Sequence, residues 1–454
     1  MFKMKIITLS LLALLLVMSF ASCASDTTSD SPLPSKDMKA YLQVRVTVDG
    51  SGDTRASRAA TEPQGGEDGD GREPGINKEN EVNSLTVLLY QSAKADLSQD
   101  DATIDYVYTF TGLTASTPSS GSNVTYITNP REINPIIVGK DYRVLVIANA
   151  GDMTSKCQGK TISQIRDMQM DKVCTRNDDI AKFSDFVMSS KKDAKIDFSG
   201  ASGSGTEANP YLVNVDIERL AARIDIIPNA EYDDTNQGYY YDVKDGANVI
   251  GGFKLESVTP SKVMTKGEYL IKRVSSDPAL TSITYFGLEA KDADNKATNY
   301  VVCPWTNIHT STTLSDAEVL PSLYNVKKAT STSSAPTDAS YILDYVMENT
   351  TTDNKEAYST GLIFKGKYYE SSDWDATKHR PIASATGTDK YYTYTIRHSD
   401  PTGSGPKTAP MYYGIVRNNI YRIKIEGVVG EKKGMILTIA VKKWAKYTHA
   451  ETSM

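Results

Sequence analysis

The stretch that decides the fold is YLQVRVTV, residues 41–48. Every second residue is aliphatic and the residues between them are mostly polar, which is the period-two pattern of a β-strand with one buried face. The aliphatic face consists of Leu42, Val44, Val46 and Val48. Burial of four such side chains contributes about 6–12 kcal/mol before entropy is considered, so the pattern predicts a strand inside a sheet core.

A long polar connection follows this strand. The next strand pattern begins at residue 85, and residues 49–84 are dominated by Gly, Asp, Glu, Pro and Asn, a composition that buries too little apolar surface to order itself. Proteases cut such segments first, and this one contains Arg55, Arg58 and Arg72. Removal of the strand by a cut there would leave an apolar groove with unpaired backbone on both walls, which another segment would have to fill.

The C-terminal region repeats the pattern of the first strand. Its apolar face consists of Met435, Leu437, Ile439 and Val441, followed by Trp444. Gly430 and Gly434 lie before this face and allow a hinge. The pattern leaves two interpretations open: residues 435–454 replace the excised strand, or they form the last strand of their own sheet.

The N-terminal residues are typical of an export signal. Lys3 and Lys5 precede an apolar run over residues 6–20, and small residues stand directly before Cys23. These features predict a secretory signal at residues 1–22 rather than a membrane-spanning helix. Cys23 would then become the lipidated first residue, and residues 23–39, rich in Ser, Thr, Asp and Pro, would be a tether. Simple secretion without a lipid is the alternative.

The composition favours a mainly β protein. The chain has 454 residues, with 27 tyrosines against 9 phenylalanines, and its short apolar runs are separated by Ser, Thr, Gly and Asp turns. The net charge is −6, and the sequence contains no basic patch with interleaved aromatics that would support nucleic-acid binding. Strands are predicted at residues 85–90, 104–110, 124–128, 136–138, 142–148, 211–227, 252–258, 299–302, 361–369, 391–397, 411–416 and 421–426.

Two tandem β-sandwich domains with few short helices are the expected architecture. One short helix is predicted within residues 161–173, where apolar residues recur at threes. The alternation over residues 211–227 shifts phase at Leu220, which indicates a bulge or a strand that passes between sheets. We place the domain boundary near Pro228, because the polar, tyrosine-rich residues after it contain few aliphatics. Residues 59–228 and 229–434 would then form the two domains.

The sequence offers no catalytic group, cofactor site or metal site. It contains four histidines without a pair at metal-ligand spacing, and neither a nucleophile elbow nor a glycine-rich phosphate loop before a helix. The acidic clusters at residues 67–70 and 292–295 lack a full EF-hand loop, which favours solvated loops over calcium sites. A disulfide between Cys157 and Cys174 is chemically permitted in an exported chain, and two small buried hydrophobes are the alternative. We therefore expect a protein that is not an enzyme.

Several segments, in their order along the chain, resemble the fimbrillins of Bacteroidales, the shaft subunits of type V pili, and in particular the shorter-fimbria family. These segments are the lipobox-like residues 22–23, the strand at 40–48 with the Arg-Ala sites after it, and residues 82–87, 142–150, 217–224, 413–421 and 437–444. The resemblance covers most of the chain. It implies a mainly β fold of two tandem transthyretin-like Greek-key β-sandwich domains with few short helices.

By this resemblance the protein is a structural subunit of a cell-surface fimbria that supports adhesion or biofilm formation. The lipid on Cys23 would hold the precursor at the outer membrane, and an arginine-specific protease would cut after Arg55 or Arg58 to release residues 40–58. Arg72 is less favoured because Glu73 and Pro74 follow it.

The same resemblance implies assembly by donor-strand exchange. Residues 435–454 of one copy would fill the groove of the next, with Trp444 as an anchor. The partners would be copies of the chain in a head-to-tail filament, together with anchor and tip fimbrial subunits.

Two alternatives differ from a shaft subunit. A fimbrial anchor or tip subunit would lack either the working cleavage loop or the free tail. A surface lipoprotein that binds glycans or host proteins through tyrosine-rich loops would keep residues 41–48 as an ordinary strand and would not polymerise.

Overall fold

The computed structural model describes most of the chain in several stretches. These are residues 37–48, 72–74, 76–92, 101–116, 124–190, 193–198, 205–230, 232–236, 238–264, 266–270, 275–276, 283–284, 324–325, 341–350, 359–398, 413–430 and 434–445. Within them, no helix combines the length and apolar character needed to cross a membrane.

The described chain is mainly β, as the sequence predicts, and its helices are short. The helical elements are α1 (Thr154–Cys157), α2 (Ile162–Arg166), and the 3-10 turns η1 (Asn77–Asn80), η2 (Ile180–Lys182) and η5 (Ser371–Asp373). Helix α2 lies within the predicted helical segment, and Thr161 caps its N-terminus: the Thr161 side chain accepts a hydrogen bond from the backbone N–H of Gln164, and the Thr161 backbone N–H donates to Gln164 Oε1. That reciprocal cap explains why the helix starts there.

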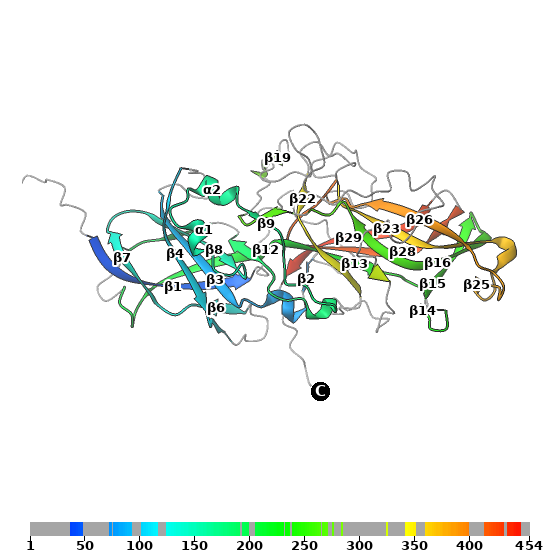
Figure 1. Cartoon of the computed structure of the whole chain (residues 1–454), viewed down its shortest axis with the longest axis horizontal. Coiled ribbons are helices and arrows are strands. Elements are labelled where there is room, and N and C mark those ends of the chain that lie inside the picture. The colour runs from blue at the N-terminus through cyan, green and yellow to red at the C-terminus, as the bar shows by residue number, and fades with distance from the viewer. Residues whose placement is uncertain are drawn as a thin grey trace, which may run out of the picture. The chain divides into compact units, whose positions relative to one another are not determined.

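The first large sheet is built around the N-terminal strand (Figure 1). Along its main path lie β4 (Ile104–Thr111), β3 (Ser84–Gln91), β8 (Tyr142–Ala148), β10 (Met188–Ser190), β12 (Tyr211–Arg219), β1 (Asp37–Val48), β6 (Thr125–Ile127) and β5 (Thr114–Ala115). Strand β7 (Arg131–Ile137) also pairs with β1, and β11 (Ala194–Ile196) pairs with β8. Strand β1 is therefore an inner strand, with neighbours on both sides.

The second large sheet contains the C-terminal strand. Its main path runs through β2 (Arg72–Pro74), β29 (Gly434–Ala445), β28 (Asn419–Val429), β15 (Gly238–Asp245), β16 (Asn248–Ser261), β23 (Gly361–Glu370) and β26 (Thr388–Thr395). Off this path, β13 (Ala221–Ile227) pairs with β28 and β21 (Ile342–Met347), β14 (Tyr232–Asp233) pairs with β15, and β20 (Tyr324–Asn325) pairs with β16. Figure 1 shows β29, in red, in this sheet with β28.

Short two-stranded pairs complete the β structure. They are β9 (Gln169–Met170) with β17 (Gly267–Glu268), β18 (Ser275–Ser276) with β19 (Ile283–Thr284), β22 (Asn349–Thr350) with β27 (Gly414–Ile415), and β24 (Trp374–Asp375) with β25 (Arg380–Pro381).

The phase shift at Leu220 marks a strand that passes between sheets, one of the two predicted outcomes. Strand β12 belongs to the first sheet and β13 to the second, and Leu220 between them is fully buried. Its backbone N–H donates to the carbonyl oxygen of Val187, which satisfies the backbone at the crossing. The second sheet thus begins before Pro228, while the division into two domains at that residue remains a prediction.

Two apolar cores accompany the two sheets. The first contains the buried faces of β1, β3, β8 and β12, and it also takes in later side chains such as Leu270 and Tyr345. The second contains the buried faces of β13, β15, β16, β23 and β28. Strand β21 supplies residues to both cores, because Tyr345 packs in the first and Val346 in the second.

Several sequence-based boundaries differ from the structure. Strand β7 begins at Arg131, earlier than the predicted residue 136, and β27 is a two-residue strand. The polar residues that follow Pro228 include two strands absent from the sequence-based list, β14 and β15, because Tyr239 and Tyr241 supply much of the buried face of β15. The strand predicted at residues 299–302 lies outside the described residues.

Candidate assembly site

Strand β1 is deeply integrated into the first core. Leu42, Val44 and Val46 have no exposed surface, and the same holds for Ala40 and Val48. The residues between them are half-buried. The predicted alternation therefore exists, with the aliphatic side inside.

Both edges of β1 are hydrogen-bonded to other strands. On one side β12 runs parallel to it, with Leu42 beside Tyr211 and Val48 beside Ile217. On the other side β7 and β6 run antiparallel, with Tyr41 beside Glu132 and Val46 beside Tyr126. Without β1, the described strands would be left with a gap between two unpaired edges.

Polar side chains form an ion pair and hydrogen bonds between β1 and its neighbours. The Lys39 ammonium lies 2.5 Å from a Glu132 carboxylate oxygen, and the Tyr41 hydroxyl donates to the same carboxylate at 3.2 Å. The Thr128 hydroxyl accepts from the backbone N–H of Val44 at 3.0 Å. Hydrogen bonding to Lys39 holds the pKa of Glu132 below its usual value, and the same contact raises the pKa of Lys39. Solvent screens these exposed charges, so apolar burial rather than the ion pair dominates the hold on β1.

The predicted processing residues lie outside the described residues. This applies to Cys23, Arg55 and Arg58. The third arginine of the connection, Arg72, begins β2, so part of the predicted polar connection is a strand. Its backbone pairs with Lys443 in β29.

The predicted donor segment is paired within its own chain. Strand β29 forms a long antiparallel ladder with β28, from Asn419 beside Lys443 to Val429 beside Gly434. Met435 and Leu437 are half-buried against the second core, whereas Ile436 is 48% exposed. This arrangement is the second of the two interpretations of the tail. The backbones of Ile439, Val441 and Trp444 lie in β29, and their side chains are outside the described residues.

Two glycines flank the connection between β28 and β29. Gly430 has φ of 50° and Gly434 has φ of 106°. The backbone at Gly434 occupies a region that side chains with a Cβ rarely adopt, although nothing lies within 4 Å of where that Cβ would be. Backbone conformation, and not packing, therefore requires glycine at this position.

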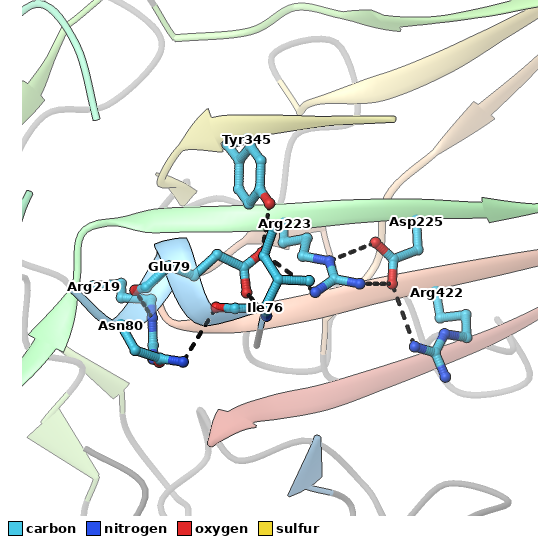
Figure 2. Close-up of polar contacts among 8 residues, drawn as sticks. All are labelled: Ile76, Glu79, Asn80, Arg219, Arg223, Asp225, Tyr345 and Arg422. Carbon is cyan, nitrogen blue, oxygen red and sulfur yellow. Dashed lines mark hydrogen bonds and ion pairs between the residues drawn. The ribbon is translucent and has the colours of Figure 1, made fainter. Parts of the chain in front are cut away.

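A buried polar cluster, which the sequence reasoning missed, joins both sheets to η1 (Figure 2). The Arg223 guanidinium donates to Asp225 at 2.7 and 2.9 Å and contacts Glu79 at 3.3 Å. The Tyr345 hydroxyl also donates to Glu79. All four side chains have at most 1% exposure. The signal in the sequence was the pair of charges within the otherwise apolar residues 220–227.

A second arginine completes the cluster. Arg219 Nε donates to the backbone carbonyl of Glu79 at 2.9 Å, and its other nitrogens donate to the side chains of Asn80 and Asn418. Arg422, on β28, reaches Asp225 at 3.4 Å. The cluster therefore connects η1 with the strand crossing at Leu220 and with β28.

Burial and charge oppose each other in this cluster. Burial raises the pKa of Glu79, while Arg223 and the Tyr345 hydroxyl act in the opposite direction. Burial alone would lower the pKa of Arg223, but Asp225 and Glu79 raise it above its ordinary value, which keeps the guanidinium charged. A buried charge of this kind persists only with its partners in place.

The permitted disulfide between Cys157 and Cys174 is not formed. Both cysteines are free and buried. Burial raises the pKa of the Cys157 thiol to about 11 and that of the Cys174 thiol to about 12, so both stay protonated and behave as small hydrophobes. Spacing in the sequence permits a bridge but does not bring two Cβ atoms together. The described residues also contain no group of three or more metal-binding side chains.

Two family models match the sequence. Residues 40–219 match the major fimbrial subunit protein (FimA), and residues 386–433 match the C-terminal model of the major fimbrial subunit protein type IV, fimbrillin. The first match begins at β1 and ends with β12, and the second spans β26 and β28. The chain belongs to the fimbrillin family. Fimbrillins are structural subunits of fimbriae and not enzymes.

Solved structures similar to this fimbrillin include adhesion and fimbrial proteins. A candidate cell adhesion protein from Parabacteroides distasonis has 17% identity and a TM-score of 0.47, with 90% of this chain and 100% of that chain covered. The tip fimbrial protein Mfa3 from Porphyromonas gingivalis, with a C-terminal truncation, has 12% identity, a TM-score of 0.44 and coverage of 90% and 100%. A fimbrilin from Porphyromonas gingivalis has 13% identity, a TM-score of 0.41 and coverage of 90% and 99%. No curated protein matches the sequence.

Proposed function

We propose that this fimbrillin is a shaft subunit of a cell-surface fimbria that is exported as a lipoprotein through Cys23. A cut after Arg55 or Arg58 would release β1, and β29 of a neighbouring copy would take its place. The observation that carries the proposal is that β1, an inner strand with a fully buried aliphatic face, is followed in the sequence by a connection with arginine sites.

Loss of β1 would create a strong binding site. Four fully buried aliphatics contribute about 6–12 kcal/mol, and the two edges of the gap would each lack backbone partners. A replacement strand would restore both the apolar burial and the backbone hydrogen bonds. Main-chain hydrogen bonds would provide affinity, and alternate side-chain pockets would set the register.

The tail has the pattern that the gap requires. Met435, Leu437, Ile439 and Val441 repeat the spacing of Leu42, Val44, Val46 and Val48. If the tail adopts the direction of β1, Met435 lies beside Tyr211 of its new neighbour and Val441 beside Ile217. This register is part of the proposal.

Exchange would be favourable because the tail gains neighbours. In its own sheet β29 has a long partner, β28, on one edge, and among the described residues its other edge pairs only with the three-residue β2. In the gap it would have strands on both edges. Each apolar residue that passes from a half-buried to a fully buried position adds about 1 kcal/mol. A head-to-tail contact of this kind does not close and therefore builds a filament.

The observed pairing of β29 also supports a second candidate. A subunit that keeps β29 in its own sheet could accept a donor without donating one, and it would end a fibre as an anchor or tip. A surface lipoprotein that binds glycans or host proteins and never polymerises is the remaining alternative.

Limited cleavage of the lipid-free precursor tests the proposal. An arginine-specific protease should remove the N-terminal strand, as intact-mass analysis would record, and negative-stain microscopy should then show filaments. Arg55→Lys combined with Arg58→Lys should block the cut, whereas the control Arg72→Lys should not.

The tail is tested by two truncations of different length. Deletion of residues 435–454 should abolish filaments, whereas deletion of residues 446–454, which leaves β29 intact, should preserve them. A clean cut that leaves a stable monomer would contradict the shaft assignment and favour an anchor, a tip or a binding lipoprotein.

A further inference from the structure

A three-residue strand covers the far end of the tail. Strand β2 runs parallel to β29, with Arg72 beside Lys443, Glu73 beside Trp444 and Pro74 beside Ala445. On its other edge Lys443 also pairs with Asn419 of β28, and there the ladder between β28 and β29 ends. Among the described residues, Lys443 therefore has strands on both edges, Trp444 and Ala445 pair with β2 alone, and Gly434 pairs with β28 alone.

The position of β2 in the chain links the tail to the processing connection. Residues 49–71 join β1 to β2, and both proposed cleavage sites, Arg55 and Arg58, lie within them. Strand β2 lies after both sites, so it would stay with the subunit after the cut. With the connection intact, the chain joins β2 to β1 upstream and to η1 downstream; after the cut, β2 would remain joined only to η1.

The downstream end is fixed by the buried cluster shown in Figure 2. Ile76 follows β2 almost directly, and its backbone N–H donates to Glu79 Oε2 at 2.7 Å. Asn80 Nδ2 donates to the carbonyl oxygen of Ile76 at 3.2 Å. Through Glu79 and Asn80, this turn is fastened to the two buried arginines, Arg219 and Arg223.

The cluster also reaches the sheet that holds the tail. Arg422 contacts Asp225 and lies on β28 beside Ala440 of β29. One buried network thus anchors the chain after β2 and the strand against which β29 pairs. Because removal of one partner would leave an uncompensated buried charge, the anchor is firm, and β2 is its short, weaker extension.

We propose that residues 72–80 act as a strap that holds the end of β29 in its own sheet and slows tail release until the connection is cut. The inference rests on the proposed function for its biological meaning, but the strap itself is a property of the uncut chain. A short strand with one free end frays more readily than one with both ends held, so cleavage loosens the strap as it removes β1. Processing would then open the groove and free the donor in one event.

The chain offers a matched pair of variants for the test. The dipeptide Glu-Pro occurs at residues 73–74, in β2, and also at residues 62–63 of the same connection. The strap variant is Glu73→Gly with Pro74→Gly, and the control is Glu62→Gly with Pro63→Gly. Both leave the buried cluster and all arginines unchanged, and equal melting temperatures would show that both variants fold.

Hydrogen–deuterium exchange of the uncut chain is the primary measurement. Peptides that cover residues 441–445 should exchange about tenfold faster in the strap variant than in the wild type or the control, because backbone pairing with β2 is lost. After cleavage, the strap variant should also form filaments with a shorter lag. Equal exchange of residues 441–445 in all three chains would overturn the strap.

The two proposals fail in different ways. In one case, the cut wild type forms no filaments, but hydrogen–deuterium exchange of residues 441–445 still differs between the strap variant and the control. The strap is then a feature of the chain, and the shaft assignment fails. In the other case, filaments form, but hydrogen–deuterium exchange of residues 441–445 is the same in the strap variant and the control. The shaft assignment then stands, and the strap is wrong.

Discussion

Arg223 shows how much this chain depends on single buried residues. Its guanidinium holds Asp225 and Glu79 at once, and all three side chains are buried. Burying an unpaired arginine costs several kcal/mol, so each partner is required for the others to remain charged. The cluster therefore joins η1, β13 and β21 through charge rather than through apolar packing.

Tyr345→Phe tests this dependence at one atom. The change removes the hydroxyl that donates to Glu79 but keeps the ring against Phe183 and Phe186. Because Glu79 is fully buried, loss of that donor should lower the free energy of unfolding by about 1–3 kcal/mol. Urea denaturation measures the change.

The matched control is Tyr108→Phe, on a half-buried ring under Arg131. It should change the free energy of unfolding by less than about 0.5 kcal/mol. Equal effects of the two substitutions would show that the hydrogen bond to Glu79 contributes nothing specific.

Single-residue features were the hardest to predict from sequence. The face of Leu42, Val44 and Val46 was predictable, because alternation alone specifies which side chains are buried. The burial of Glu79 was not predictable, because it belongs to a polar segment and its side-chain partners Arg223 and Tyr345 lie more than a hundred residues away. A buried charge is visible in sequence only where it interrupts an apolar run, as Arg223 does.

At the scale of elements, β1 and β29 differ in how they are held. Strand β1 has partners on both edges and a fully buried face, whereas β29 has one full partner and a half-buried start. The strand that is proposed to leave by proteolysis is thus the firmly held one. The strand that is proposed to move without being cut, β29, is the more weakly held one.

Gly434→Ala should release the tail more easily. At φ of 106° an alanine is strained, whereas in an extended donor strand it is not. The substitution should therefore destabilise the β28–β29 connection by about 1–3 kcal/mol and shorten the lag of filament formation after cleavage. Light scattering measures the lag, and Gly427→Ala, within β28 and without a positive φ, is the control. A longer lag would mean that the closed hairpin is needed for assembly.

The hold on β1 should depend on pH through Glu132 and Lys39. The folded pKa of Glu132 is lowered, so its contribution is present above about 4.5 and is lost as pH falls through the folded value. The pKa of Lys39 is raised, so its contribution is present below about 10.5 and is lost as pH rises through the folded value.

After cleavage, the released strand should therefore dissociate more slowly at pH 7 than at pH 3. Mass analysis of the retained and free peptide at each pH measures this. Glu132→Gln should reduce the difference in dissociation rate between pH 7 and pH 3. An unchanged profile in that variant would assign the pH dependence to other groups.

Elements were predictable where apolar alternation was regular. Strand β8 matches its predicted bounds at residues 142–148, and β3 extends one residue beyond its prediction at each end. Strand β15 was missed because its buried face is made of tyrosines, and β2 because Arg72–Pro74 carries no apolar pattern at all. Pairing of β2 depends on backbone geometry, which composition does not record.

At the scale of the whole molecule, the chain would need β1 to fold and would need to lose it to assemble. We therefore expect a chain expressed from Ala56 onward, which never contains β1, to fold less well than a full chain that folds first and is cut afterwards. Its first core would lack Leu42, Val44 and Val46 while the sheet forms.

Size-exclusion chromatography and circular dichroism would compare the two preparations. The truncated chain should aggregate or lack cooperative unfolding, and addition of a peptide of residues 37–55 should rescue it. A truncated chain that folds as a monomer without the peptide would show that β1 is dispensable for folding.

The family and the general architecture could be anticipated from sequence, because they rest on the order of apolar strands over the whole chain. The two strands of the candidate site, β1 and β29, could be predicted as strands, since both show the same alternation of apolar residues. Their present pairing could not, because the same alternating strand fits its own sheet and a neighbour's groove equally well.

The parallel alignment of β1 with β12 has a consequence for any fibre built on this site. A donor that copies β1 can enter in one direction only, because reversal would replace a parallel ladder with an antiparallel one and shift every hydrogen bond. All subunits would then point the same way, so the fibre would have two chemically different ends. Growth and attachment to the cell would then take place at different ends, and the polarity of the whole fibre would derive from the direction of one strand, β1.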